Sequence, residues 1–208
     1  MRPLIPAALL LAYACGSSNP EPVSAPTPAD SAALARATPH ALIAAREQYY
    51  DIDGSSAGAL RNQINRLGPK DESGESKDAL TVWSVESAYA AAQRGDSCVL
   101  RDVKVTLDVT VTLPRWKPPA TATAQLVRTW QTYLKAVRVH EAGHRTIAER
   151  NAREVMAALT PLRGMNCDLL SDEASRTAER IVADGHARNR AYDVETKHVQ
   201  SQGVVLGP

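Results

Sequence analysis

The sequence predicts an α+β domain in which a small antiparallel or mixed sheet packs on a long helix and on a second, C-terminal helix. Three observations support this fold class. Hydrophobic residues alternate with polar ones over 98–113, which is typical of a strand with one buried face. Apolar residues recur every three or four positions over 123–158, and a shorter helical pattern follows over 172–189.

The composition is that of one folded domain with appendages. The 208 residues are 44% hydrophobic and 23% charged, and the formal net charge is only +1. The chain therefore lacks the basic excess of nucleic-acid-binding proteins, and we expect no nucleic-acid partner. Phe is absent and only 4% of the residues are aromatic, so the core must be built from Ala, Leu, Val and Ile.

Residues 1–14 are typical of a secretory signal peptide, because Arg2 precedes an apolar run that is too short to span a bilayer. Small residues precede Cys15 in the arrangement that a bacterial lipoprotein signal peptidase accepts, so we expect Cys15 to be lipidated. The alternative is an ordinary cleavage after Ala14 that releases a secreted protein. The expected location is the bacterial cell envelope, on the periplasmic or outer-membrane side, with membrane contact through acylated Cys15 only.

Residues 15–38 are rich in Ser, Pro, Ala and Thr, which predicts a disordered tether before a domain over 39–208. Within this domain the spacing of Leu60 and Ile64 predicts a helix over 55–67 that ends at Gly68. A Pro-rich segment over 114–119 is expected to break the last strand, because Pro cannot donate to a sheet ladder. Strands are expected over three ranges: 46–53, 81–89 and 98–113.

The second helix is expected to begin after Ser171, which is a suitable N-cap, and the tail over 192–208 is expected to be irregular. If Cys15 carries a lipid, Cys98 and Cys167 remain in a compartment where disulfides persist, and we predict that they pair. The alternative is two separate buried thiols. Neither cysteine lies in a CxxC motif, so we do not expect them to bind a metal.

The chemistry of the chain concentrates in the long helix, which contains the pattern HExxH. His140 and His144 are four residues apart and lie on one helix face, where two imidazoles can bind one Zn(II). Glu141 is placed to take a proton from a water molecule that the metal activates. The alternative is a solvent-facing pair of histidines, but Gly143 argues against it, because a mid-helix Gly favours a close approach to the backbone.

Two histidines leave a catalytic zinc one protein ligand short. The second helix and the tail contain several residues of the right type. No NExxxE-like pattern occurs among them, so helical spacing alone does not select one. The candidates are Glu173, Glu179, Asp184, His186, Asp193 and His198.

Successive blocks of the chain resemble a bacterial family of predicted secreted Zn-dependent proteases that is catalogued as a domain of unknown function. The resemblance covers about residues 46–203 in order, and Cys98 and Cys167 match cysteines that such domains carry. It implies an exported metallopeptidase-like domain with a zincin-like fold. The matching blocks are Tyr50-Asp51 with Gly54, Leu60-Arg61, Asn65 to Pro69, Thr81-Val82-Trp83, Cys98-Val99-Leu100, Thr112 to Trp116, His140 to Arg145 and Tyr192 to His198.

The resemblance makes His198 the first choice for the third zinc ligand and Asp193 the second, since both lie in the same matching block. Tyr192 is expected to donate a hydrogen bond to the oxyanion, or to be a core residue. The function implied is an exported zinc-dependent peptidase that hydrolyses peptide bonds in a peptide or protein substrate. Two alternatives remain: a non-catalytic envelope lipoprotein with a structural metal site, and a zinc amidase that acts on cell-wall peptides.

Overall fold

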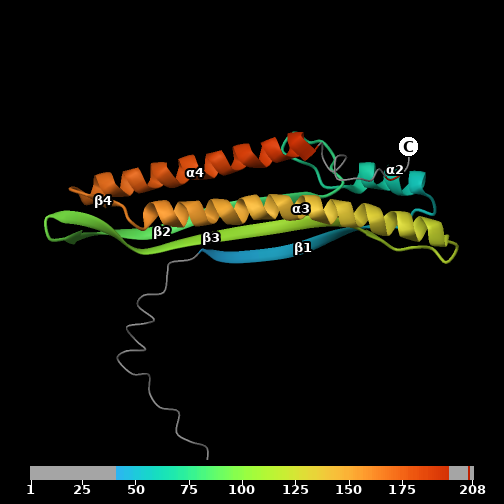
Figure 1. The fold of residues 1–208 in the computed structure, drawn as a ribbon, viewed down its shortest axis with the longest axis horizontal. Coiled ribbons are helices and arrows are strands. Elements are labelled where there is room, and N and C mark those ends of the chain that lie inside the picture. The colour runs from blue at the N-terminus through green and yellow to red at the C-terminus, as the bar shows by residue number, and fades with distance from the viewer. Residues whose placement is uncertain (1–40, 197–205, 207–208) are drawn as a thin grey trace, which may run out of the picture. The chain divides into compact units, whose positions relative to one another are not determined.

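The computed structural model describes residues 41–196 and 206 and contains one mixed sheet with two long helices. The four-stranded sheet has the order β1-β3-β2, with a short β4 beside β3; β1 runs parallel and β2 antiparallel to β3. Figure 1 shows α3 and α4 lying along the sheet. The predicted α+β class is confirmed. The elements are β1 (Leu42–Ile52), α2 (Ala57–Leu67), β2 (Leu80–Arg94), β3 (Ser97–Trp116), α3 (Ala124–Leu159), β4 (Arg163–Gly164) and α4 (Cys167–Thr196).

The alternation expected over 98–113 places one face of β3 in the core. Its buried odd-numbered residues pack with apolar residues of α3 and α4, so both helices cover this face of the sheet. The register between β2 and β3 shifts between Ala88 and Ala90, where Asp102 adopts a positive φ of 51° in a bulge. Among the least exposed strand residues on the helix-facing side are Val105, Leu107 and Val109.

The expectation that β3 ends before Pro114 is wrong. The strand continues to Trp116, and Pro114 pairs with Tyr50 of β1. The pairing of β2 with β3 ends at Thr112, so β3 has only one strand neighbour at Pro114. A proline is tolerated there because a strand with one free side does not need every N–H in a ladder.

The expected helices over 55–67 and 123–158 are confirmed within two residues at each end. Ser56 caps α2 by accepting a hydrogen bond from the backbone of Ala59, and Thr123 caps α3 by accepting one from Leu126. The long helix α3 spans 36 residues, and the HExxH pattern lies near its middle. The position of this pattern along α3 determines which neighbouring element the two histidines contact.

The predicted bounds of the last helix are wrong at both ends. It begins at Cys167, where Asn166 accepts hydrogen bonds from the backbone of Asp168 and Leu169, and it continues to Thr196. Ser171 therefore lies inside the helix and donates to the carbonyl of Cys167 instead of capping. The expected irregular tail is replaced by helix over 192–196. The rest of that tail, apart from residue 206, lies outside the described residues.

The predicted disulfide is confirmed. Cys98 and Cys167 are bonded with a Cα–Cα distance of 5.2 Å, which ties the start of β3 to the start of α4. The predictions for residues 1–38, including lipidation of Cys15, fall outside the described residues. No helix in the part of the chain that the structure describes is long and apolar enough to cross a bilayer.

Candidate metal centre

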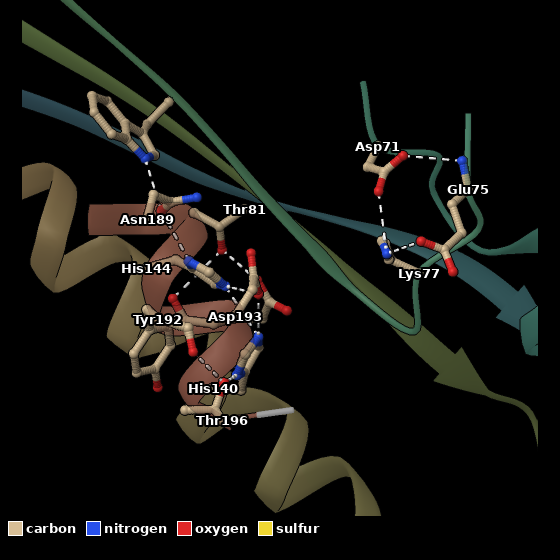
Figure 2. Close-up of polar contacts among 12 residues, drawn as sticks. Asp71, Glu75, Lys77, Thr81, His140, His144, Asn189, Tyr192, Asp193 and Thr196 are labelled. Atoms are coloured by element: carbon tan, nitrogen blue, oxygen red, sulfur yellow. Dashed lines mark hydrogen bonds and ion pairs between the residues drawn. The ribbon is translucent and has the colours of Figure 1, made fainter. Parts of the chain in front are cut away.

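Three side chains from two helices converge on one point between α3 and α4 (Figure 2). The Nε2 atoms of His140 and His144 are 3.0 Å apart. The Oδ1 atom of Asp193 lies 3.2 Å from the first of these nitrogens and 3.0 Å from the second. A nitrogen or oxygen ligand atom of each residue therefore faces the same small volume, where one ion can contact all three.

The local sequence explains this convergence. His140 and His144 are one helical turn apart, and their stripe on α3 packs against α4. Their exposed fractions are 3% and 5%, and Glu141 between them is 4% exposed. The alternative of solvent-facing histidines is therefore wrong. On α4 the residues that face the centre also recur in steps of three and four: Asn189, Tyr192, Asp193 and Thr196.

The second nitrogen of each imidazole has a polar partner on α4. Thr196 Oγ1 lies 3.2 Å from His140 Nδ1 and donates its own hydrogen to the carbonyl of Tyr192. Thr196 must then accept from His140, so Nδ1 of that ring carries a hydrogen, and in the neutral ring the Nε2 lone pair faces the centre. Asn189 Oδ1 lies 2.9 Å from Nδ1 of His144, so this oxygen is the polar partner of the second imidazole.

The three residues fit a zinc ion. Two imidazole nitrogens and one carboxylate oxygen are a donor set that zinc accepts, and tetrahedral bonds of about 2.0 to 2.1 Å imply ligand atoms roughly 3.3 Å apart. The corresponding distances here are 3.0, 3.0 and 3.2 Å. Burial lowers the pKa of His144, but the hydrogen bond and charge of Asp193 outweigh it, so this pKa lies above its ordinary value.

The side chain of Glu141 projects from α3 toward the sheet. Its Oε2 accepts a 2.6 Å hydrogen bond from Thr81 Oγ1 on β2. Burial raises the pKa of Glu141, and the bond from Thr81 and the nearby imidazoles only partly offset this effect. A cleft of about 170 Å³ between β1 and α3 is lined in part by Glu141, so space for small molecules extends to this side chain.

Gly143 is required by the close approach of Tyr192. A Cβ atom at Gly143 would lie 2.2 Å from the hydroxyl oxygen of Tyr192, which no side chain larger than hydrogen permits. The Tyr192 ring is also stacked on His140 and meets His144 edge-on, with centroid distances of 5.2 and 5.0 Å. The expectation that something approaches the backbone at Gly143 is thus confirmed, and the approaching group comes from α4.

The chain matches a known protein family. Residues 47–199 match the family described as bacterial protein of unknown function (DUF922). The chain belongs to the DUF922 family. Comparison of the chain with curated proteins and with solved structures found no match. The family description names no activity, so membership in DUF922 places the candidate centre in a bacterial family without adding a substrate.

Within this DUF922 domain, the structure brings together His140, His144 and Asp193 from the residues that the sequence singled out. His198 lies outside the described residues, so its role as third ligand stays a prediction. His186 stacks on Trp83 at a centroid distance of 4.1 Å instead of joining the cluster. The remaining candidates on α4 are exposed and lie outside the cluster: Glu173, Glu179 and Asp184.

Four residues that contact the candidate ligands or Glu141, directly or through a neighbour, were not predicted as site residues. Asn189 and Thr196 contact the imidazoles, Thr81 contacts Glu141, and Trp83 contacts Asn189 at 3.2 Å. A signal for two of them was present in the sequence, since 189 and 193 are four apart, as are 192 and 196. This stripe is polar, so a search for apolar periodicity does not detect it.

Proposed function

We propose that this chain is an exported zinc-dependent peptidase that hydrolyses peptide bonds. The observation that carries the proposal is the position of Glu141, a buried carboxylate adjacent in sequence to His140 in a centre of three potential ligands. A site with three protein ligands leaves one position for water and substrate, whereas structural zinc sites are usually closed by four. The disulfide supports a location outside the cytoplasm.

His140, His144 and Asp193 would hold the zinc, with Asp193 as third ligand because its carboxylate lies within 3.2 Å of both imidazoles. When bound, zinc supplies a Lewis acid that polarises a carbonyl and lowers the pKa of water toward 7. Glu141 acts as the general base that takes the proton from the attacking water, and it then delivers a proton to the leaving amine. Thr81 orients the Glu141 carboxylate through Oε2 and leaves Oε1 for this proton transfer.

The substitution that tests this role is Glu141→Gln, because the amide keeps the shape of the side chain and removes the base. We expect zinc content equal to wild type and cleavage of unfolded protein substrates reduced by at least about 100-fold. The matched control is Glu149→Gln, two turns further along the same helix, where the carboxylate pairs with exposed Arg145. Retained cleavage in Glu141→Gln would remove Glu141 from the mechanism.

The same assay distinguishes the two alternative functions. Cell-wall peptides should be offered beside protein substrates, and cleavage of the former alone would favour the amidase. Zinc content in Asp193→Ala and His198→Ala decides the third ligand, since we expect the metal to be lost in the first variant. Loss of zinc in the second variant alone would assign the ligand to His198, and loss in both would indicate a closed site and favour the non-catalytic alternative.

A further inference from the structure

The strand β2 contacts the metal centre through a side chain that binds no metal itself. Trp83 is 6% exposed and lies on the helix-facing side of the sheet, two residues after Thr81. Its Nε1 lies 3.2 Å from Oδ1 of Asn189 on α4, and His186 stacks on its indole with an interplanar angle of 10°. The His186 ring therefore fixes the face of the indole, and the Asn189 amide fixes its nitrogen.

This contact determines the orientation of the Asn189 amide. An indole N–H is a donor and never an acceptor, so the Asn189 atom beside it must be the carbonyl oxygen. The reversed amide would place N–H groups of both residues against each other. The same Oδ1 lies 2.9 Å from Nδ1 of His144. An oxygen that carries no hydrogen can only accept, so Nδ1 of His144 must donate a hydrogen to it. Asp193 Oδ1 accepts in the same way at Nε2, 3.0 Å away, until a cation takes the Nε2 lone pair.

We propose that Trp83 and Asn189 are positioning residues of the metal centre, which together hold His144 in the tautomer that presents the Nε2 lone pair to the metal. The inference rests on the metal centre of the proposed function and adds that a residue of the sheet helps to orient one of its ligands. In this tautomer the Nε2 atoms of His140 and His144 and the carboxylate of Asp193 are three acceptors within 3.2 Å of one another. Such a cluster favours a bound cation, so the arrangement is prepared for the ion before it binds.

The other amide orientation gives the opposite result. If Asn189 turned its NH₂ group toward His144, it would donate to Nδ1 and place the ring hydrogen on Nε2, where it blocks metal binding. Trp83 excludes this orientation. Replacing the indole by a ring without N–H should therefore release the amide, and the fraction of His144 with hydrogen on Nε2 should rise. Outer contacts of this kind change metal affinity by roughly 10- to 100-fold.

The test uses three variants of the full chain and one matched control. Trp83→Phe keeps an aromatic ring and removes the N–H donor, Asn189→Leu removes the acceptor, and Asn189→Asp keeps it. The control is Trp116→Phe, since Trp116 is also buried and donates its indole hydrogen, over 3.0 Å, to the carbonyl of Gly54. Trp116 packs with Leu60 and Ile64 of α2 in a core cluster that contains none of the candidate metal ligands. Zinc affinity is measured by competition with a chelator, and the imidazole tautomers of the metal-free protein by nitrogen NMR at a pH where the ring is neutral.

We expect zinc affinity to fall about tenfold in Trp83→Phe and by up to about 100-fold in Asn189→Leu. The loss should be rescued in Asn189→Asp, whose carboxylate keeps the acceptor, and Trp116→Phe should bind zinc like wild type. Equal zinc affinity in Trp83→Phe and Trp116→Phe would overturn the inference. The NMR measurement remains decisive if wild type binds no zinc, because Asn189 must still hold a hydrogen on Nδ1 of His144 in wild type, and the fraction of rings with this hydrogen must fall in Trp83→Phe. A His144 ring without hydrogen on Nδ1 in the wild-type protein would overturn the inference even if zinc binds.

Discussion

Substitution of Gly143 by alanine should weaken the metal centre, although alanine is the better helix former. A Cβ atom at this position would lie 2.2 Å from the hydroxyl oxygen of Tyr192 and 2.3 Å from its Cζ. Carbon atoms in contact need about 3.5 Å, so the ring must withdraw by roughly 1 Å. It cannot simply rotate, because it is packed between His140 and His144.

The expected magnitude follows from two opposing effects. Alanine in a helix interior gains about 1 kcal/mol over glycine, whereas overpacking a close contact costs about 1 to 3 kcal/mol. The free energy of unfolding should therefore fall by up to about 2 kcal/mol. Zinc affinity should fall further than stability, because Asp193 follows Tyr192 on α4 and moves with it. Metal bonds tolerate displacements of only about 0.2 Å.

The assay is a pair of measurements on Gly143→Ala: urea unfolding of the metal-free chain and zinc affinity by competition with a chelator. Gly58→Ala is the matched control, since Gly58 lies in helix α2 and a Cβ atom there would meet nothing within 4 Å. The control should gain stability and keep its zinc affinity. Truncation of the ring by Tyr192→Ala in the Gly143→Ala background should recover part of the lost affinity. If Gly143→Ala is stabilised like the control and binds zinc normally, the close approach of α4 at this point is wrong.

Three further predictions concern the disulfide, the base and the metal. Replacing Cys98 and Cys167 by serine should lower the free energy of unfolding by about 3 to 4 kcal/mol. Zinc affinity should not change, because the bond lies at the opposite end of α4, roughly seven turns from the centre; a parallel loss of affinity would argue against this separation. Thr81→Val should leave zinc content unchanged and lower kcat by roughly 10- to 100-fold, as expected for one lost hydrogen bond to the Glu141 carboxylate, and an unchanged kcat would rule out that orientation. Zinc at 100 times its Kd should stabilise the chain by about 2.7 kcal/mol over the chelated form in a thermal melt, and identical melts would indicate no binding to the folded state.

The sequence predicted those elements whose two faces differ in polarity. Alternation along β3 and the apolar stripe of α3 are strong signals, because each repeats over many residues. The continuation of β3 through Pro114 could not be predicted, since it depends on β2 ending its pairing at Thr112. Strand neighbours are a tertiary property, and a single sequence does not state them.

The candidate site was predicted on α3 and only in part on α4. HExxH gives His140, Glu141 and His144 directly, because the i, i+4 spacing is local. Asp193 was expected in an irregular tail as the second choice of ligand, since the last turns of α4 carry polar residues toward the centre instead of an apolar stripe. Contacts such as that of Trp83 with Asn189 join residues that are 106 positions apart, and no local pattern indicates them.

The most direct test of the metal centre is the zinc content of the purified chain, produced in an oxidising compartment and measured by mass spectrometry beside His144→Ala and Asp193→Ala. The proposed function predicts one zinc per chain in wild type and none in either variant, while circular dichroism shows all three folded. A folded wild-type chain without zinc, or zinc retained in both variants, would contradict a centre formed by these side chains.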